Sequence, residues 1–284
     1  MKKNEILTAM LATAALLPIG TSCSNTENEE ITQIESTPRT VNIQTRTAED
    51  GAAIDWPLTL YAFNSSGNMT ASTTVNDAET AAELQLNKGS YTLVALAGTD
   101  NLEIPAEPKL TDDIGIPTGC ILTTAPQITT LPITVASDDI TKDMTLTYPV
   151  AQVKMTLTDM PTDISEATAT LSPLYTSIAF NGTTSGNSSA TLTLTKQEDG
   201  SWTSGNTFVM PSAENLSLTI TTGDESYTVA TTSTLEAGKT YALNGTYKGE
   251  VTVTVSFGIQ NWTPGDDIDF DITGKEDTAP DDAS

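Results

Sequence analysis

Apolar and polar residues alternate over short stretches of this sequence, and this pattern predicts β-strands. The first stretch is "RTVNIQTR", residues 39–46, in which Val41, Ile43 and Thr45 alternate with polar side chains. Successive side chains of a strand point to opposite faces of its sheet. The stretch is therefore predicted to be a strand with one face against a core.

Similar alternation recurs along most of the chain. The stretch from Tyr91 to Ala97 is apolar nearly throughout, which is typical of a strand buried on both faces. After the N-terminal region, no segment sustains the apolar spacing of a helix. The sequence predicts an all-β protein, with further strands in "WPLTLYAF", "AAELQL", "LPITVAS", "MTLTYPVAQVKMTLTDM", "EATATLSPL", "ATLTLTK", "NTFVMP", "LSLTITT", "ESYTVATTS", "KTYALNGTY" and "EVTVTVSFGI".

Turn residues and prolines divide this pattern into two halves. "NSSGN" at 64–68 is turn chemistry, and the proline-containing segment 99–130 is predicted to be rich in loops. A turn glycine followed by a strand that opens on tyrosine occurs twice, at residues 86–93 and 235–243. We therefore predict two β-sandwich domains in tandem, at residues 39–146 and 147–273, with one long sandwich as the alternative.

The N-terminus has the features of an export signal. Lys2 and Lys3 precede an apolar stretch, Ile6–Gly20, that is too short to span a bilayer. Small residues and Cys23 follow, so residues 1–22 resemble a bacterial lipoprotein signal peptide whose removal leaves an acylated Cys23. Gly20 departs from the leucine usual at that position. Plain secretion with an incidental cysteine is the alternative.

The segments at the two ends are polar. Residues 23–38 are predicted to be an acidic, flexible tether, and residues 274–284 a polar tail. The acidic residues behind Cys23 resemble signals that send lipoproteins of the Bacteroidetes to the outer face of the outer membrane. The other cysteine, Cys120, is predicted to be a buried small apolar residue, although a disulfide with Cys23 is a competing possibility.

Charge and composition restrict the possible functions. Asp and Glu number 37 against 12 Lys and Arg, a formal net charge of −25 that disfavours binding to nucleic acid. The absence of histidine removes the usual general base and the commonest metal ligand. We predict no catalytic residue, no cofactor and no metal site. An acidic cluster that includes Asp267 and Glu276 superficially suggests a calcium loop, but apolar residues interleave it as in a strand.

Several stretches together resemble the fimbrillins, the pilus subunits of Bacteroidetes that build type V pili. They are the lipoprotein signal at Cys23, "LTLYAFNSSGNM" (58–69), "LNKGSYTLVALAG" (86–98), "YPVAQVKMTL" (148–157) and "VTVTVSFGIQNWTPGDDI" (251–268). Each is a loose β-pattern, and together they cover most of residues 23–272. The resemblance implies two tandem transthyretin-like β-sandwich domains and assembly by donor-strand exchange.

The resemblance also implies roles for particular residues. In the family, a protease cuts after an arginine, and the first strand leaves a groove that a neighbouring subunit fills. Arg39 and Arg46 are the chain's two arginines and bracket this strand, so they are the candidate cleavage sites. The exchanged strand would contain Val41, Ile43 and Thr45.

A donor strand would come from the C-terminal region. "VTVTVSF" and "DDIDFDI" both alternate, and the second places Ile268, Phe270 and Ile272 on one face. Alternate side chains of such a strand can fill the pockets of a groove. We take the second as the candidate donor strand, while "VTVTVSF" is more simply an ordinary strand of the C-terminal half.

These observations favour a structural subunit or anchor of a cell-surface fimbria, exported to the outer membrane as a lipoprotein. Its partners would be other fimbrial subunits and, through the lipid on Cys23, the membrane. The alternative is a surface-exposed glycan-binding lipoprotein, in which Trp56, Trp202 and Trp262 would stack on sugars. A glycosidase that uses two carboxylates is a third possibility.

Overall fold

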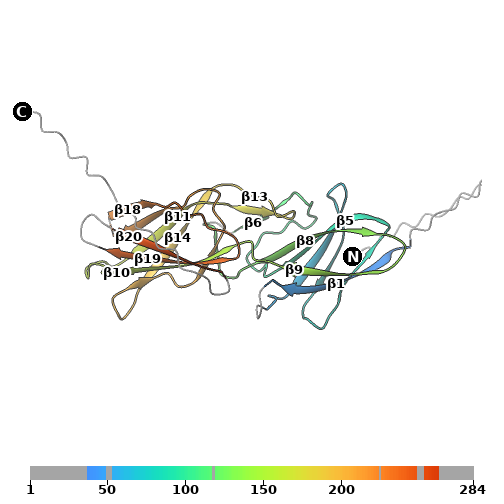
Figure 1. The fold of residues 1–284 in the computed structure, drawn as a ribbon, viewed down its shortest axis with the longest axis horizontal. Helices are drawn as coiled ribbons and strands as arrows, with labels where there is room; N and C mark the ends of the chain where they lie inside the picture. Colours follow the sequence, from blue (N-terminus) through green and yellow to red (C-terminus); the bar gives the residue numbers. More distant parts are fainter. Residues whose placement is uncertain (1–36, 49–52, 117–118, 224, 248–252, 262–284) are drawn as a thin grey trace, which may run out of the picture. The chain divides into compact units, whose positions relative to one another are not determined.

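The computed structural model describes residues 37–48, 53–116, 119–223 and 225–247, and the backbone of 253–261. None of these residues is helical, and strands connected by turns and loops make up the fold (Figure 1). The all-β prediction is confirmed. The predicted signal peptide, most of the tether and the polar tail lie outside the described residues.

Two sheets in the first half of the chain face each other across a shared core. One has the strand order β4-β1-β9 and the other β3-β2-β5-β8. Their apolar faces meet in one cluster, to which Val41, Leu58, Leu84, Leu93 and Leu146 all contribute. The strands are β1 (Arg39–Thr47), β2 (Leu58–Asn64), β3 (Met69–Val75), β4 (Ala82–Leu86), β5 (Gly89–Ala97), β8 (Gln127–Val135) and β9 (Ile140–Leu146).

Strand β5 is buried on both faces, as its nearly continuous apolar sequence predicts. Leu93 and Ala95 belong to the core cluster between the two sheets. Val94 and Leu96 point the other way, into a cluster that contains Phe180. A small sheet of order β13-β12-β6 supplies residues to this second cluster, and its strands are β6 (Asp113–Gly115), β12 (Ser177–Ala179) and β13 (Thr184–Ser185).

The remaining strands form one continuous hydrogen-bonded path. Its order is β18-β17-β11-β14-β15-β10-β16-β7, and β10 also pairs with β19, which pairs with β20. The two-residue strand β15 pairs with both β14 and β10 and so joins two parts of the path. The strands are β7 (Ile121–Leu122), β10 (Ala151–Thr158), β11 (Ala167–Leu174), β14 (Ser188–Lys196), β15 (Trp202–Thr203), β16 (Thr207–Val209), β17 (Ser217–Thr222), β18 (Glu225–Ala230), β19 (Lys239–Tyr247) and β20 (Val253–Asn261).

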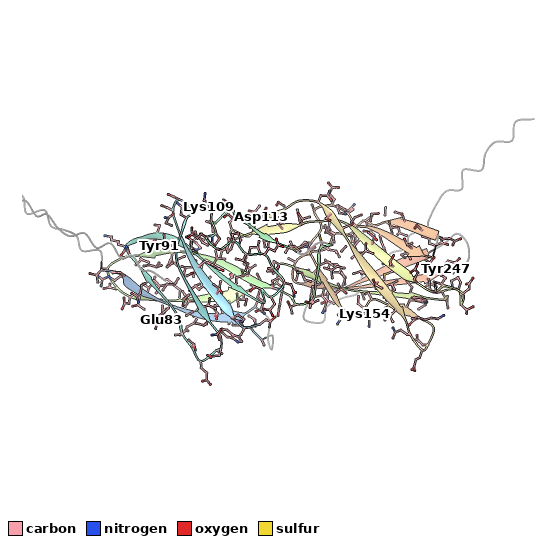
Figure 2. All side chains as sticks on the ribbon, turned by 180° about the vertical axis from the view of Figure 1, so that it is seen from behind. Glu83, Tyr91, Lys109, Asp113, Lys154 and Tyr247 are labelled. Carbon is pink, nitrogen blue, oxygen red and sulfur yellow. The ribbon has the colours of Figure 1, made fainter. Side chains whose placement is uncertain are left out.

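The alternation of apolar and polar residues in the sequence corresponds to an alternation of buried and exposed side chains in the strands. In β10, Val153 and Met155 are fully buried in the core, while Lys154 between them is exposed (Figure 2). In β4, Glu83 likewise lies exposed between two buried residues (Figure 2). The strands therefore separate an apolar core face from a polar outer face.

Some elements differ from the sequence expectations. Strand β3 was not predicted, because "MTASTTV" has few large apolar residues. In the structure it pairs antiparallel with β2, across a bulge at Ala62 and Phe63. The predicted turn is present, since the Asn64 side chain accepts hydrogen bonds from the backbone of Ser66 and Asn68. The repeated glycine–tyrosine pattern falls in β5 and β19, which are not equivalent, because β5 has only antiparallel neighbours and β19 pairs parallel with β10.

The division between residues 146 and 147 stays a prediction. Strand β9 ends at Leu146 and β10 begins at Ala151, so the pattern does break there. However, β6 pairs with β12 and β7 with β16, and both pairs join strands from the two sides of that break. Contacts place the described residues in one compact unit that begins at Ser36.

Candidate functional site

The first strand, β1, is the middle strand of its sheet. On one side it pairs antiparallel with β4, and Val41 lies opposite Leu84. On the other side it pairs parallel with β9, and Val41 lies opposite Ile140. A strand from the start of the described chain is therefore inserted between two strands that come later in the sequence.

The inner face of β1 completes the core. Val41 has no exposed surface and Ile43 is 4% exposed, while Thr45 is half-buried. Burying an aliphatic side chain of this size contributes about 1.5–3 kcal/mol, so this strand stabilises the sheet by its side chains as well as its backbone. The residues singled out for an exchanged strand thus share one strand and one face.

Withdrawal of β1 would leave a groove. Neighbouring strands lie about 4.8 Å apart, so β4 and β9 would face each other across about 10 Å with unpaired backbone groups. The floor of that groove would include Leu58 and Leu60 of β2, which are fully buried in the same cluster. A second extended chain with alternating apolar side chains matches this shape and chemistry.

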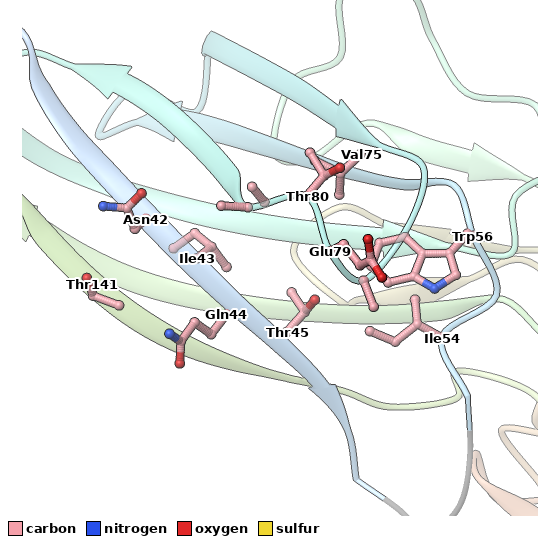
Figure 3. Close-up of a pocket in the computed structure, with 13 residues that line it drawn as sticks. Asn42, Ile43, Gln44, Thr45, Ile54, Trp56, Val75, Glu79, Thr80 and Thr141 are labelled. Atoms are coloured by element: carbon pink, nitrogen blue, oxygen red, sulfur yellow. The ribbon is translucent and has the colours of Figure 1, made fainter.

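Only part of β1 is paired on both sides. Strand β4 begins at Ala82, opposite Ile43, whereas the pairing with β9 continues to Thr47. The residues that precede Ala82 turn away from β1, and a cleft of about 520 Å³ opens there (Figure 3). Its lining comes from Asn42–Thr45 of β1, the segment Ala78–Ala82, and Ile54, Trp56, Val75 and Thr141.

The loop on the far wall of this cleft is held by Asp77. Its Oδ1 accepts hydrogen bonds from the Glu79 amide (3.1 Å), the Thr80 amide (2.9 Å) and the Thr80 hydroxyl (2.8 Å). Hydrogen bonding to the Thr80 side chain and amide holds the pKa of the Asp77 carboxyl below its ordinary value of 3.8. The loop therefore has a built-in local structure beside β1.

The two arginines lie inside β1. Arg39 begins the strand opposite Leu86, and Arg46 is exposed near its end opposite Thr145. The Arg46 Nε donates a hydrogen bond to the Thr145 hydroxyl at 3.2 Å. The peptide bond after Arg46 is thus within a strand pair, and a protease could bind it only after the end of β1 opened locally.

Several residues of interest fall outside the described part of the chain. They are Cys23, the candidate donor residues Ile268, Phe270 and Ile272, and Trp262. The other candidate donor, "VTVTVSF", is in part described, because β20 begins at Val253 and pairs with β19 over its whole length. Cys120 is buried and forms no disulfide with another described residue.

The tryptophans do not form a common platform among the described residues. Trp202 is 3% exposed in the core cluster around β10 and β11, and its indole Nε1 has no hydrogen-bond partner within the described part of the chain. Trp56 is half-buried against a different cluster and lines the cleft beside β1. Sequence reasoning identified Trp56, but it gave no sign that Glu79 and Gln44 would share its cleft.

The described residues contain no cluster of His, Cys, Asp and Glu suited to a metal ion. Nor does this part of the chain have a helix with the length and apolar character of a membrane span.

The hydroxyl of Tyr227 donates a hydrogen bond to the carboxylate of Glu225. This bond, together with burial, raises the pKa of Tyr227.

Solved structures of two fimbrial proteins and of a candidate polysaccharide-binding protein share this fold. The fimbrial anchor protein Mfa2 from Porphyromonas gingivalis superimposes with a TM-score of 0.59 at 14% identity, over 81% of this chain and 99% of that one. A candidate polysaccharide-binding protein from Bacteroides thetaiotaomicron gives a TM-score of 0.58 at 12% identity, over 77% and 95% of the two chains. The C-terminally truncated tip fimbrial protein Mfa3 from P. gingivalis gives 0.51 at 10% identity, over 79% and 100%.

Identities this low establish likeness of fold alone. No curated protein sequence matches the chain. A family model for the fimbrillin-A associated anchor proteins Mfa1 and Mfa2 matches residues 36–267, which is most of the sequence. The chain therefore belongs to the family of fimbrillin-A associated anchor proteins Mfa1 and Mfa2.

Proposed function

We propose that this protein is a structural subunit or anchor of a cell-surface fimbria and that it joins other subunits by strand exchange at β1. Membership of a fimbrial anchor family supports the first part. The observation that carries the second part is the position of β1, an N-terminal strand with a buried apolar face between β4 and β9. No catalytic step is part of this function.

The pairing of β1 suits a strand that is held and later released. Val41, Asn42 and Ile43 pair with both β4 and β9, whereas residues 44–47 pair with β9 alone among the described strands. Opening therefore begins at less cost at the end that carries Arg46. Until then the strand fills its own groove and prevents premature association.

The proposal includes the path to the surface. The chain is exported as a lipoprotein, acylated at Cys23 and held on the outer membrane by the tether 23–38. Cleavage after Arg46, or after Arg39, would release a polymerising subunit, whereas an uncut chain would remain an anchor. The proposed subunit has two domains, 39–146 and 147–273, and its strand with Ile268, Phe270 and Ile272 fills the groove of the next subunit.

Mass spectrometry of the mature N-terminus from cell envelopes tests this route. An acylated Cys23 would support an anchor, and Thr47 as the first residue would support a polymerising subunit. If Thr47 is found, Arg46→Ala should abolish the detergent-resistant ladders of the assembled fimbria, with Arg39→Ala as the matched control. Unchanged ladders in both variants, or an N-terminus without lipid that begins before Arg39, would refute it.

A further inference from the structure

The outward face of β1 carries no negative charge. Its side chains are those that alternate with the core residues of the strand, namely Thr40, Asn42, Gln44 and Arg46. The amide of Gln44, for example, points away from Trp56 (Figure 3). Three of these four residues are neutral and one is cationic, in a chain whose formal net charge is −25. The strand that fills the groove thus differs in charge from the chain as a whole.

Two carboxylates flank the middle of this outward face. Glu83 of β4 lies opposite Asn42, and Asp143 of β9 lies opposite Gln44. Both carboxylates are exposed. Opposite side chains of neighbouring strands have Cβ atoms about 5 Å apart, so a charge at position 42 or 44 would lie beside a carboxylate. Lys142 does not compensate directly, because it lies opposite a core residue of β1.

The neighbours at the two ends of β1 supply hydrogen bonds but no positive charge. The Gln85 amide of β4 donates to the Thr40 hydroxyl at 3.1 Å, and the Thr145 hydroxyl of β9 accepts from Arg46 at 3.2 Å. A third carboxylate, Asp139, accepts a hydrogen bond from the Thr40 amide at 2.8 Å. The groove without β1 would therefore be bordered by carboxylates and neutral side chains.

We propose that this groove selects a donor strand whose outward side chains are neutral or basic, so that the donor comes from a different subunit and not from a second copy of this chain. The inference rests on the proposed strand exchange and names its partner. An apolar inward face is common to many strands, so it does not distinguish one donor from another. Like charges at opposite positions destabilise a strand pair, so the outward side chains can make the distinction.

The chain's own candidate donor has an unfavourable charge for this groove. Its apolar residues Ile268, Phe270 and Ile272 alternate with Asp267, Asp269 and Asp271. If the apolar residues took the places of Val41, Ile43 and Thr45, Asp269 would lie opposite Glu83 and Asp271 opposite Asp143. A shift of two residues in either direction would still leave an aspartate opposite one of the two carboxylates. This acidic strand therefore suits the groove of another subunit that lacks them.

The neutral stretch Val253–Asn261 is not a free donor. As β20, it pairs with β19 over its whole length and so belongs to a sheet of its own chain. A second copy could offer this strand only by giving up that pairing. The acidic stretch thus remains the chain's candidate donor, and the groove disfavours it.

Peptide exchange into the full chain nicked after Arg46 tests the proposal. Three fluorescent peptides are added at low ionic strength: residues 37–47, residues 265–274, and residues 265–274 with Asp267→Asn, Asp269→Asn and Asp271→Asn. We expect the first and third to bind, and the acidic peptide to bind about tenfold or more weakly than its Asn variant. The difference should shrink at about 0.5 M salt, because salt screens repulsion between exposed charges.

Variants of the groove provide the second arm of the test. Glu83→Gln with Asp143→Asn should strengthen binding of the acidic peptide about tenfold. Both residues are exposed, so the core stays intact. The control pair, Glu198→Gln with Glu214→Gln, removes the same charge from exposed positions outside the sheet of β1. It should change the affinity less than about twofold.

Equal affinity of the acidic peptide and its Asn variant would overturn the proposal. So would an unchanged affinity in the chain with Glu83→Gln and Asp143→Asn, or failure of the Asn variant to bind where the peptide of residues 37–47 does. Failure of the peptide of residues 37–47 itself would overturn strand exchange and, with it, this inference. Strand exchange therefore stands when only the selection by charge fails.

Discussion

At the scale of single residues, the packing of Ile43 links the sequence pattern to the stability of the first sheet. Ile43 is 4% exposed and belongs to the core cluster, whereas its neighbour Gln44 is exposed. Both lie on β1, so they share the same backbone pairing with β9. Substituting each residue in turn therefore distinguishes the stability contributed by side-chain burial from the stability contributed by membership of the strand.

We expect Ile43→Ala to lower the free energy of unfolding by about 2–5 kcal/mol, because it removes buried methyl groups and leaves a cavity. Gln44→Ala should change it by about 0.5 kcal/mol or less. Urea denaturation of both variants measures this difference. Similar losses in the two would mean that β1 does not pack as described.

The carboxyl of Asp77 gives a pH-dependent check on the loop beside β1. Its pKa is lowered in the folded chain chiefly by the Thr80 hydroxyl. A lowered folded pKa means that the hydrogen bonds favour folding above pH 3.8, the ordinary value, and that this contribution is lost as the pH falls through the lower folded pKa. An NMR titration should place the midpoint of Asp77 below 3.8.

Thr80→Val is the matched variant for that titration, because it removes the hydroxyl and keeps the branched shape. The midpoint of Asp77 should then rise toward 3.8. A midpoint that is the same in both proteins would show that the Thr80 hydroxyl does not bond to Asp77 in solution.

Among the strands, β1 is notable because it lies between β4 and β9 and not beside the next strand in the sequence. The sheet is therefore not a simple series of hairpins. The second half repeats the arrangement, since its first strand, β10, pairs parallel with the much later β19. Both halves thus place an early strand beside a late one in parallel register. Each of these parallel pairs joins strands that are far apart in the sequence, so its formation closes a long loop and is slow. The pairing is also lost when the inserted strand is removed.

A chain cut after Arg46 should accept β1 back as a separate peptide. We expect a peptide of residues 37–47 to bind the cut chain and raise its melting temperature, because it restores the pairing with β4 and β9. Ile43→Asp in the peptide should abolish the effect, because it places a charge in the core. Thermal denaturation with each peptide measures this, and equal shifts with both peptides would argue against a specific groove.

The strand pattern was predictable because it depends on neighbours in sequence, whereas the site depends on partners far apart. Alternation around Val41 and Ile43 is local, so the buried face of β1 could be predicted before the structure was known. The end of pairing with β4 at Ala82 is not encoded near β1, so the cleft with Trp56 and Glu79 could not be foreseen. Arg46 shows the same limit, because its partner Thr145 is 99 residues away.

At the scale of the whole molecule, the chain belongs to a family of fimbrial anchor proteins. The net charge of −25 adds a physical requirement, because subunits of one sign repel one another. Association must then rest on short-range contacts such as strand pairing and apolar burial, which salt screens little. The groove occupied by β1 offers both.

If the chain joins a fimbria only after β1 leaves its groove, then locking this strand in place should prevent assembly. Asn42 of β1 lies directly opposite Glu83 of β4, a spacing at which paired cysteines form a disulfide. The control pair is Thr59→Cys with Thr74→Cys, opposite residues of β2 and β3 that leave β1 free.

The measurement is the amount of the chain in detergent-resistant fimbrial ladders, with and without reductant. We predict that the chain with Asn42→Cys and Glu83→Cys is absent from the ladders until it is reduced, while the control pair enters them in both conditions. Equal entry of the oxidised Asn42→Cys, Glu83→Cys chain would contradict the account.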